Sequence, residues 1–171
     1  MSRLDESIAA ALLILETEGE QALTMRRIAD EVGVRAPSLY KHIAGRDELI
    51  AALQAIGLRA AGQALSVARG KRTRATRLAA FAVAYRQLAL DRPALYRLTS
   101  GRPLLRDLLP DGLEREVGQV VVDVVGGDPD LARALWAFAH GMADLELAGR
   151  FPADADLDAA WRMGVRAFGA S

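Results

Sequence analysis

The stretch from Leu23 to Leu49 constrains the fold most, because its pattern predicts two short helices around a tight turn and a third helix behind them. The hydroxyl of Thr24 is placed to cap a helix that begins at Met25. Gly33 ends this helix, since glycine tolerates the left-handed backbone that a sharp reversal needs. The helix has a small apolar stripe formed by Ile28, Ala29 and Val32. This order of elements predicts a helix-turn-helix.

The second helix of this stretch is predicted from Ala36 to Ile43, because Pro37 suits a first helical position. Only two large aliphatic residues, Leu39 and Ile43, can face a core. The polar residues that remain outside are Arg35, Ser38, Tyr40, Lys41 and His42. A DNA major groove admits one α-helix whose side chains contact base edges and phosphates. The alternative is that Tyr40 is a half-buried packing residue and the charges form an ordinary solvated face.

The motifs of this stretch resemble the N-terminal domain of the TetR family of transcriptional regulators. They are T-x-R-x-I-A-x-x-x-G-V at Thr24 to Val34, P-S-L-Y-K-H-I at Pro37 to Ile43, and R-D-E-L at Arg46 to Leu49. The chain departs from the family pattern at Ile43, where the family often has Phe, and in its short N-terminal arm, which offers only Arg3.

The resemblance implies a DNA contact for nine residues. It implies phosphate contacts from Thr24, Tyr40, His42 and Arg46. It places near base edges Arg26, Arg35, Ala36, Ser38 and Lys41. We expect Arg26 and Lys41 to contribute most to sequence reading, because Arg and Lys suit guanine O6 and N7.

The rest of the chain keeps helical spacing. The apolar residues Leu4, Ile8, Leu12 and Leu15 predict a first amphipathic helix with a capping box at Ser2 and Asp5. One long helix is predicted from Arg46 to about Ala68, and shorter ones follow near residues 71–91, 94–98, 104–109, 113–125, 130–149 and 156–168. Residues 120–125, VVVDVV, have strand propensity but helical spacing, and we predict a helix there.

We therefore predict an all-α chain with two domains. Residues 1–48 form a three-helix, helix-turn-helix DNA-binding domain, and the helix from about residue 46 connects it to a helical ligand-binding and dimerisation domain at 49–171. The spelling W-x-x-x-H-G at Trp136 to Gly141, followed by Leu145-Glu146 and Gly149-Arg150-Phe151, resembles a C-terminal ligand-binding domain (WHG-like) of one TetR subgroup.

The last two predicted helices are apolar on more than one side, which indicates a second partner for them. We expect a homodimer, because a two-fold dimer matches a palindromic DNA operator with half-sites about one turn apart. The expected interface residues are Leu135, Met142, Leu145, Leu157, Trp161, Val165 and Phe168.

A small-molecule effector of unknown identity is expected to bind in the C-terminal bundle and to release the DNA. The predicted pocket residues are Phe81, Tyr85, Tyr96, Leu109, Trp136 and Phe138. The alternative for these side chains is plain core packing.

Charge gives weaker information, because 22 basic and 22 acidic residues sum to zero. Residues 26–41 nevertheless carry four basic and two acidic side chains. A second basic run lies between Arg69 and Arg77, and we prefer a solvated inter-helix loop there over further phosphate contact. Without a large global field, DNA affinity is expected to depend only modestly on salt.

Catalysis, metal binding and cofactor binding are not expected. The chain has no Cys, and the pairs His140 with Asp144 and Ser38 with His42 have a helical spacing that is common by chance. No phosphate loop or dinucleotide fingerprint is present. Apolar runs are interrupted before membrane-span length and the N-terminus is unlike a signal peptide, so a cytoplasmic protein is expected.

The function predicted from the sequence is a DNA-binding transcriptional regulator, most simply a homodimeric repressor released by its ligand. The alternative is a non-enzymatic helical interaction or architectural protein that retains a helix-turn-helix as a folding unit.

Overall fold

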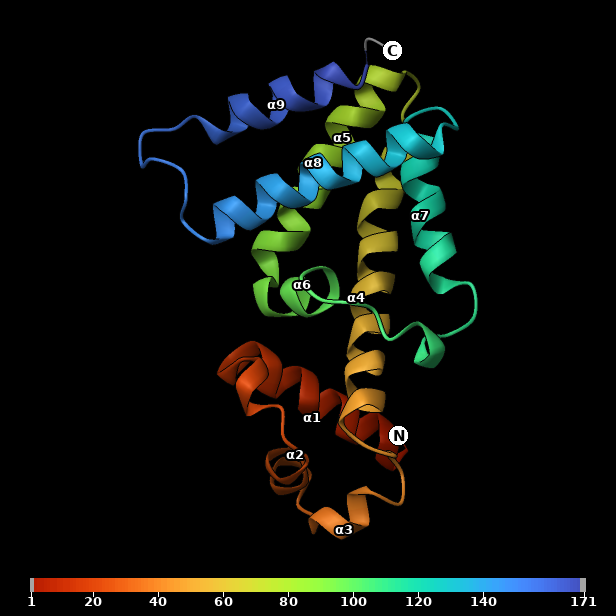
Figure 1. The fold of residues 1–171 in the computed structure, drawn as a ribbon, viewed down its shortest axis with the longest axis vertical. Coiled ribbons are helices and arrows are strands. Elements are labelled where there is room, and N and C mark those ends of the chain that lie inside the picture. The colour runs from red at the N-terminus through yellow and green to blue at the C-terminus, as the bar shows by residue number, and fades with distance from the viewer. Residues whose placement is uncertain (1, 170–171) are drawn as a thin grey trace. The chain divides into compact units, whose positions relative to one another are not determined.

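The computed structural model describes residues 2–169, and this part of the chain is helical without strands (Figure 1). The all-α fold class is therefore confirmed. The helices are α1 (Arg3–Glu18), α2 (Met25–Val32), α3 (Ala36–Leu39), α4 (Arg46–Arg69), α5 (Arg74–Asp91), α6 (Pro93–Ser100), α7 (Leu113–Val124), α8 (Pro129–Leu147) and α9 (Leu157–Ala167). Two short 3-10 helices are η1 (Glu20–Ala22) and η2 (Arg106–Leu108).

The chain divides into two compact units. The first unit comprises the chain up to Leu58 together with Arg92–Asp111, and the second comprises Arg59–Asp91 and the chain from Gly112 onward. Helix α4 thus contributes its first half to one unit and its second half to the other. Residues 92–111, which the sequence analysis placed in the second domain, pack within the first unit. The functional boundary between residues 48 and 49 stays a prediction.

The core of the first unit lies between α1, α2, α3 and the first half of α4. Ile28, Leu39 and Leu53 are fully buried there, and α6 adds Leu95 and Leu98 to the same core. Burying each of these aliphatic side chains contributes on the order of 1.5–3 kcal/mol. The capping box predicted at the start of α1 is present, since Ser2 and Asp5 bond each other's backbone N–H groups.

Helix α1 is rotated about its axis relative to the prediction, so that a neighbouring set of side chains faces the core. Leu4 is 36% exposed, whereas Ser7, Ala11 and Ile14 are fully buried. Leu15 is buried as expected. The reason is that small side chains on α1 allow close approach of neighbouring helices, an effect that a pattern of large aliphatics does not reveal.

Two helix predictions need correction. Helix α3 ends at Leu39, and the chain continues to Ile43 as a turn in which the His42 N–H donates to the Leu39 carbonyl at 2.9 Å. Residues 104–109 form only the 3-10 turn η2, because the prolines at 103 and 110 leave too few residues for an α-helix. The valine-rich segment is helical, as predicted, within α7.

Helix α4 is long and apolar enough, by length and composition alone, to cross a membrane, contrary to the expectation from the sequence. Core helices of soluble proteins meet the same criterion. In α4 the side chains of Leu49, Ile50 and Leu53 are buried in the first unit. The first half of α4 thus uses these apolar residues in the core of the first unit.

Three aromatic rings, buried Trp161 and the partly buried Phe138 and Phe168, pack together where α8 meets α9 in the second unit. The Phe138 ring lies edge-on to Trp161 at 5.8 Å between centroids and is 5.9 Å from Phe168. Gly164 makes room for this ring, because a Cβ at Gly164 would lie 2.0 Å from Phe138 Cζ. The close contact of α8 with α9 thus depends on a residue without a side chain.

We expect Gly164→Ala to destabilise the second unit by about 1–3 kcal/mol, the usual cost of overpacking. Urea unfolding followed by tryptophan fluorescence measures this unit alone, since both tryptophans, Trp136 and Trp161, lie in it. The matched control is Gly118→Ala in α7, where an added Cβ has no neighbour within 4 Å. Alanine there should stabilise the helix by about 0.5–1 kcal/mol. Equal effects of the two substitutions would contradict this packing argument.

Candidate nucleic-acid interface

Helix α2 is defined at both ends by the residues that the sequence indicated. The Thr24 hydroxyl accepts a hydrogen bond from the Arg27 N–H at 3.1 Å. Gly33 has φ 72° and ψ 34°, and the Val34 N–H donates to the Ala29 carbonyl at 2.9 Å. This is the glycine-based helix end that reverses the chain toward α3. The predicted cap and turn are confirmed, and the hydrogen of the Thr24 hydroxyl remains able to donate to a phosphate.

Two adjacent arginines on α2 have different surroundings. The Arg27 guanidinium bonds Glu18 at 2.6 Å and Glu31 at 2.8 Å, and these carboxylates raise the pKa of Arg27. In return, the hydrogen bond from Arg27 lowers the pKa of Glu18. Arg26 is exposed and forms no ion pair with any described residue. Arg27 is therefore held within the fold, and Arg26 is the arginine that a partner molecule can reach.

The short helix α3 has one buried and one exposed face. Leu39 and Ile43 have 0% and 1% of their surface exposed, so they fix α3 to the core. The opposite side carries exposed polar residues, namely Arg35, Ser38, Tyr40, Lys41 and His42. Tyr40 is 54% exposed, so a large part of its ring and its hydroxyl can be reached by a partner molecule, and its phosphate contact stays a prediction. Ala36 is partly buried at the start of the helix.

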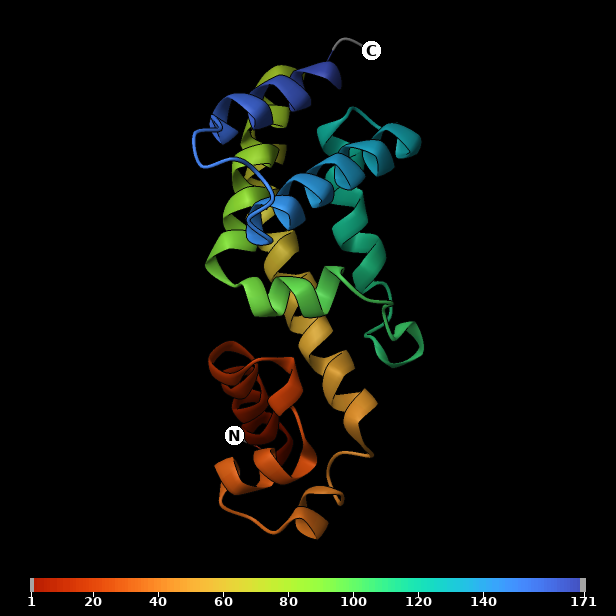
Figure 2. The ribbon, with the colours of Figure 1, turned by 60° about the vertical axis from the view of Figure 1, so that its left-hand side comes forward.

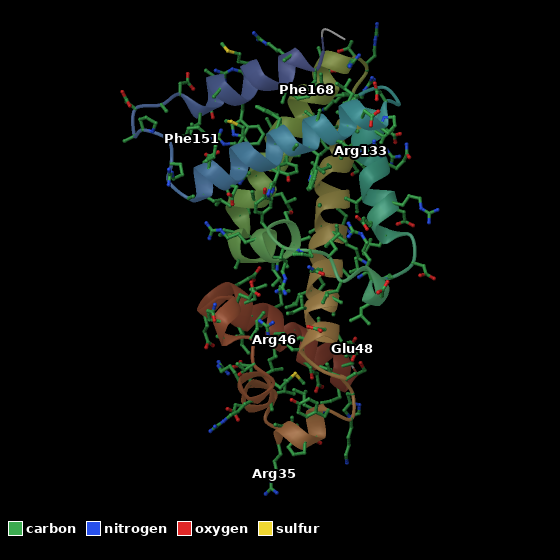
Figure 3. The ribbon with its side chains drawn as sticks, viewed as in Figure 1. Arg35, Arg46, Glu48, Arg133, Phe151 and Phe168 are labelled. Carbon is green, nitrogen blue, oxygen red and sulfur yellow. The ribbon has the colours of Figure 1, made fainter. Side chains whose placement is uncertain are left out.

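Arg35 is the N-cap residue of α3, and Figure 3 shows its side chain projecting away from the ribbon. Hydrogen-bond donors on such an exposed turn and helix match what base edges and phosphates accept. The structure therefore brings Arg35 and the polar face of α3 together on one surface.

Three residues of the R-D-E-L motif at the start of α4, namely Arg46, Glu48 and Leu49, make contacts within the fold. Arg46 Nε donates to the Leu23 carbonyl at 3.4 Å, and its guanidinium lies 3.6 Å from Glu20. Glu48 accepts a hydrogen bond from the Ala44 N–H, which closes the turn before α4. Leu49 is buried in the core. Arg46 keeps about half of its side chain exposed, so a phosphate contact there stays a prediction.

The six predicted pocket residues come from both compact units. Tyr96 and Leu109 belong to the first unit, whereas Phe81, Tyr85, Trp136 and Phe138 belong to the second. Phe81 and Tyr85 are buried, and their rings lie 5.6 Å apart. Trp136 is 47% exposed and stacks on His140 with centroids 5.8 Å apart. Within each unit, plain core packing accounts for Phe81 and Tyr96, and a ligand contact for any of the six stays a prediction.

The seven predicted interface residues also divide by burial. Leu135, Trp161 and Val165 have at most 3% of their surface exposed and belong to the core of the second unit. Their burial is accounted for by packing within the chain. The predicted interface residues that keep exposed surface are Met142, Leu145, Leu157 and Phe168, and a partner contact for any of the seven stays a prediction.

Sequence reasoning missed an ionic network in the second unit. Arg86 of α5 donates twice to Glu146 of α8, at 2.7 and 2.9 Å, and also bonds Asp158 of α9. Trp161 Nε1 donates to Glu146 at 3.2 Å. Arg86 lowers the pKa of Asp158 through this hydrogen bond. No pattern along the chain indicates it, because the partners Arg86 and Glu146 are 60 residues apart.

The second basic run contacts the end of α7. Arg69 forms an ion pair with Asp123, and Arg77 Nε donates to the Val124 carbonyl at 3.2 Å. Gln119 and Arg69 together lower the pKa of Asp123. Arginine at a helix C-terminus is favoured by the helix dipole. Two members of the run thus have partners within the second unit, which supports the structural interpretation of this run over phosphate contact.

No group of three or more His, Cys, Asp or Glu side chains within residues 2–169 has a geometry suited to a metal ion.

Two family profiles match the chain. Residues 8–53 match "Bacterial regulatory proteins, tetR family". Residues 78–168, which include the Trp136 to Phe151 motifs, match "Tetracyclin repressor-like, C-terminal domain".

Among curated relatives, the chain is 32% identical over 135 residues to the HTH-type transcriptional repressor DrrR1 of Streptomyces coeruleorubidus, covering 77% of this chain and 48% of the relative. It is 29% identical over 161 residues to the uncharacterized HTH-type transcriptional regulator Rv0681 of Mycobacterium tuberculosis, covering 89% and 73%. The chain spans less than half the length of DrrR1 and of a matching regulator from Saccharopolyspora erythraea.

Solved structures share the fold. A protein of unknown function from Rhodococcus sp. RHA1 superposes with a TM-score of 0.79 at 26% identity, over 98% of this chain and 94% of the other. A single-residue variant of TetR from Acinetobacter baumannii AYE, in complex with minocycline, gives a TM-score of 0.71 at 23% identity, over 99% and 95%. With two profiles that together span both ends of its helical fold, the chain belongs to the TetR family of transcriptional regulators.

Proposed function

We propose that the protein is a sequence-specific DNA-binding repressor. The observation that carries this proposal is the segment 35–43, which comprises α3 and the turn after it. Buried Leu39 and Ile43 fix this segment to the core, and its other side exposes Arg35, Ser38, Tyr40, Lys41 and His42. Membership of the family and the name of the repressor DrrR1 support it. The proposed activity is binding to double-stranded DNA in the cytoplasm, and no reaction is proposed.

The nine predicted contacts keep the roles that the family resemblance gives them. Arg26, Arg35 and Lys41 would donate to base edges, aided by Ser38 and by the methyl group of Ala36. Phosphates would be held by Thr24, Tyr40, His42 and Arg46. Arg27 is paired with two carboxylates and is therefore less available to DNA. This supports Arg26 as the arginine of α2 that contacts base edges.

We further propose a homodimer on a palindromic operator, released by a small-molecule effector. The exposed Leu145 on α8, 43% exposed, supports a partner for the last two helices. The minocycline complex of the structural neighbour shows that this fold accommodates a small molecule in that protein. In this proposal, the domain of residues 1–48 binds DNA, and the domain of residues 49–171 dimerises and binds the effector.

Selection from a randomised duplex-DNA pool, followed by sequencing at a stated salt concentration, tests the proposal. A palindromic motif with half-sites about 34–36 Å apart is the expected result for a dimer with two reading helices. Light scattering at micromolar protein should give the mass of a dimer. A folded dimer that enriches no sequence would contradict DNA reading and would favour a helical interaction protein instead.

We expect operator affinity to fall with salt at a moderate slope. Arg26, Arg35, Lys41 and Arg46 place four cations per protomer at the proposed DNA surface. If every one of them, eight in a dimer, displaced a counterion from the DNA, the log–log slope would be about −7, and it should be no steeper than that. Titration of a selected operator between about 50 and 300 mM salt measures it. A slope steeper than about −10 would show that further basic residues, such as the run after Arg69, contact DNA.

A further inference from the structure

The amide side chain of Gln54 is buried in the first unit. It has 0% of its surface exposed and lies in the first half of α4. Its Nε2 donates to the Leu98 carbonyl at 3.3 Å and to the Pro103 carbonyl at 3.1 Å, and its Oε1 accepts from the Leu105 N–H at 3.0 Å. One side chain thus satisfies three backbone groups of the segment that ends α6 and leads into η2.

Glutamine is the residue type that fits this position, because the contacts need two N–H donors and one carbonyl acceptor. An apolar side chain of the same size would take away the partner of the buried Leu98 carbonyl and of the partly buried Pro103 carbonyl and Leu105 N–H. A carboxylate would keep the bond from Leu105 but face two carbonyl oxygens with negative charge. A buried polar group without a partner is costly, so these three hydrogen bonds favour glutamine at position 54 over other side chains.

A second contact shows how closely α6 approaches α4. A Cβ added to Gly57 would lie 2.0 Å from Thr99 Oγ1, so α6 packs against α4 at a position that only glycine allows. Leu95 and Leu98 extend from α6 into the core shared with α1 and α4. Figure 2 shows α6, in green, lying across α4. Residues 92–105 are therefore held to the first unit by core packing and by Gln54.

The same segment reaches a predicted DNA contact through two ion pairs. Arg102, beside Pro103, bonds Glu20 at 2.6 Å. Glu20 in turn lies 3.6 Å from Arg46, whose phosphate contact the family resemblance implies. At the other end of α6, Arg92 bonds Glu16 of α1 at 2.5 Å. Displacement of residues 98–105 would therefore disturb both the packing of α4 and the surroundings of Arg46.

We propose that residues 92–105 are a structural part of the DNA-binding unit and that Gln54 is the positioning residue that holds them there. Gln54 acts through the placement of α4 and Arg46, at a distance from any base or phosphate. The expected effect on affinity rests on the proposed DNA-binding function. The three hydrogen bonds of Gln54 to residues 98, 103 and 105, which we call the clamp, are a property of the free protein.

The sharpest test is the pH dependence of a Gln54→Glu variant of the full chain. Protonated Glu replaces the amide with one O–H donor and one acceptor, while ionised Glu loses the donor and repels the carbonyls. Burial and the two facing carbonyls raise the pKa of such a carboxyl. We expect operator affinity about tenfold below wild type at about pH 8 and within about twofold of it near pH 5.5. Each value is a ratio to wild type at the same pH, so effects of pH that the two chains share cancel.

Two controls separate positioning from general instability. Gln54→Met, which cannot ionise, should bind about tenfold more weakly at both pH values. Val124→Ala removes buried volume in α7 of the second unit, far along the chain from the clamp, and should lower stability while leaving affinity within about twofold. If Gln54 affected DNA binding only through general stability, Val124→Ala and Gln54→Met would lose the same affinity when they lose the same stability.

Hydrogen exchange of the free protein tests the clamp without DNA. The Leu105 N–H and the amides of 98–105 should exchange at least about tenfold faster in Gln54→Met than in wild type, because their buried partner is gone. This result stands even if wild type selects no operator, so a failure of the clamp and a failure of the proposed function are distinguishable. Unchanged exchange, wild-type affinity of Gln54→Glu at both pH values, or a loss that acid does not reverse would overturn the proposal.

Discussion

A chain carrying both Arg35→Ala and Lys41→Ala is expected to bind the selected operator at least about 25-fold more weakly than wild type. Each side chain is an exposed donor on the α3 surface, and loss of a base contact costs about 1–3 kcal/mol, roughly five- to 150-fold. The two effects should add if the residues contact different bases. Fluorescence anisotropy with a labelled operator at fixed salt measures the loss.

The matched control for this variant is Arg115→Ala with Arg133→Ala. Both residues are exposed on helices of the second unit, and the double substitution removes the same net charge. If charge alone drives binding, both double variants weaken it equally. If α3 reads the sequence, only the first one loses affinity, and repeated selection shows relaxed preference at the positions that Arg35 and Lys41 contact.

A folded Arg35→Ala, Lys41→Ala chain that retains wild-type affinity and preference would remove α3 as the reading helix. Because neither side chain is buried, the double substitution should leave the fold intact, so a loss of affinity would report on DNA contacts. Retained affinity and preference would favour a helix-turn-helix kept only as a folding unit, with function in the helices of the second unit.

The elements predicted well from the sequence are those whose determinants lie close together along the chain. The Thr24 cap, the Gly33 turn and the division of α3 into a buried and an exposed face each depend on residues within a few positions of one another. The length of α3 was overestimated, because the turn at residues 40–43 retains apolar spacing without a full α-helical pattern.

The features that sequence reasoning missed depend on pairs of residues distant along the chain. Gln54 binds carbonyls 44 and 49 residues away, and nothing near it marks it as a clamp. The sequence likewise did not show that Tyr96 and Phe81, both aromatic and both after α4, belong to different compact units. Nor did it show that Leu135 and Trp161 are buried in the core of the second unit.

The Arg86 network of the second unit has measurable consequences for stability. Arg86 and Glu146 have only 25% and 12% of their side chains exposed, so solvent screens this pair less than the surface pairs of the chain. Three helices, α5, α8 and α9, meet at it through Arg86, Glu146 and Asp158. Removing one partner would leave the remaining charge and the Trp161 N–H in a largely dry place.

We expect Glu146→Leu to lower the free energy of unfolding of the second unit by about 2–4 kcal/mol. Breaking a fully buried pair costs about 3–5 kcal/mol, and the effect here should be smaller because Arg86 is partly exposed and keeps Asp158. Urea unfolding followed by the fluorescence of the two tryptophans measures it in this unit. The surface control is Arg133→Ala, whose pair with Asp130 is mostly exposed and should contribute no more than about 0.5 kcal/mol.

The double variant Arg86→Met, Glu146→Leu separates the worth of the pair from the cost of an unpaired charge. Replacement of both partners by apolar residues is often neutral, so the double variant should recover at least half of the stability lost by Glu146→Leu. The Trp161 N–H still lacks its acceptor, which prevents full recovery. If the double variant is less stable than Glu146→Leu, the network stabilises the fold by its own attraction. In that case Arg86 would hold α5 to α9 through Asp158 even without Glu146.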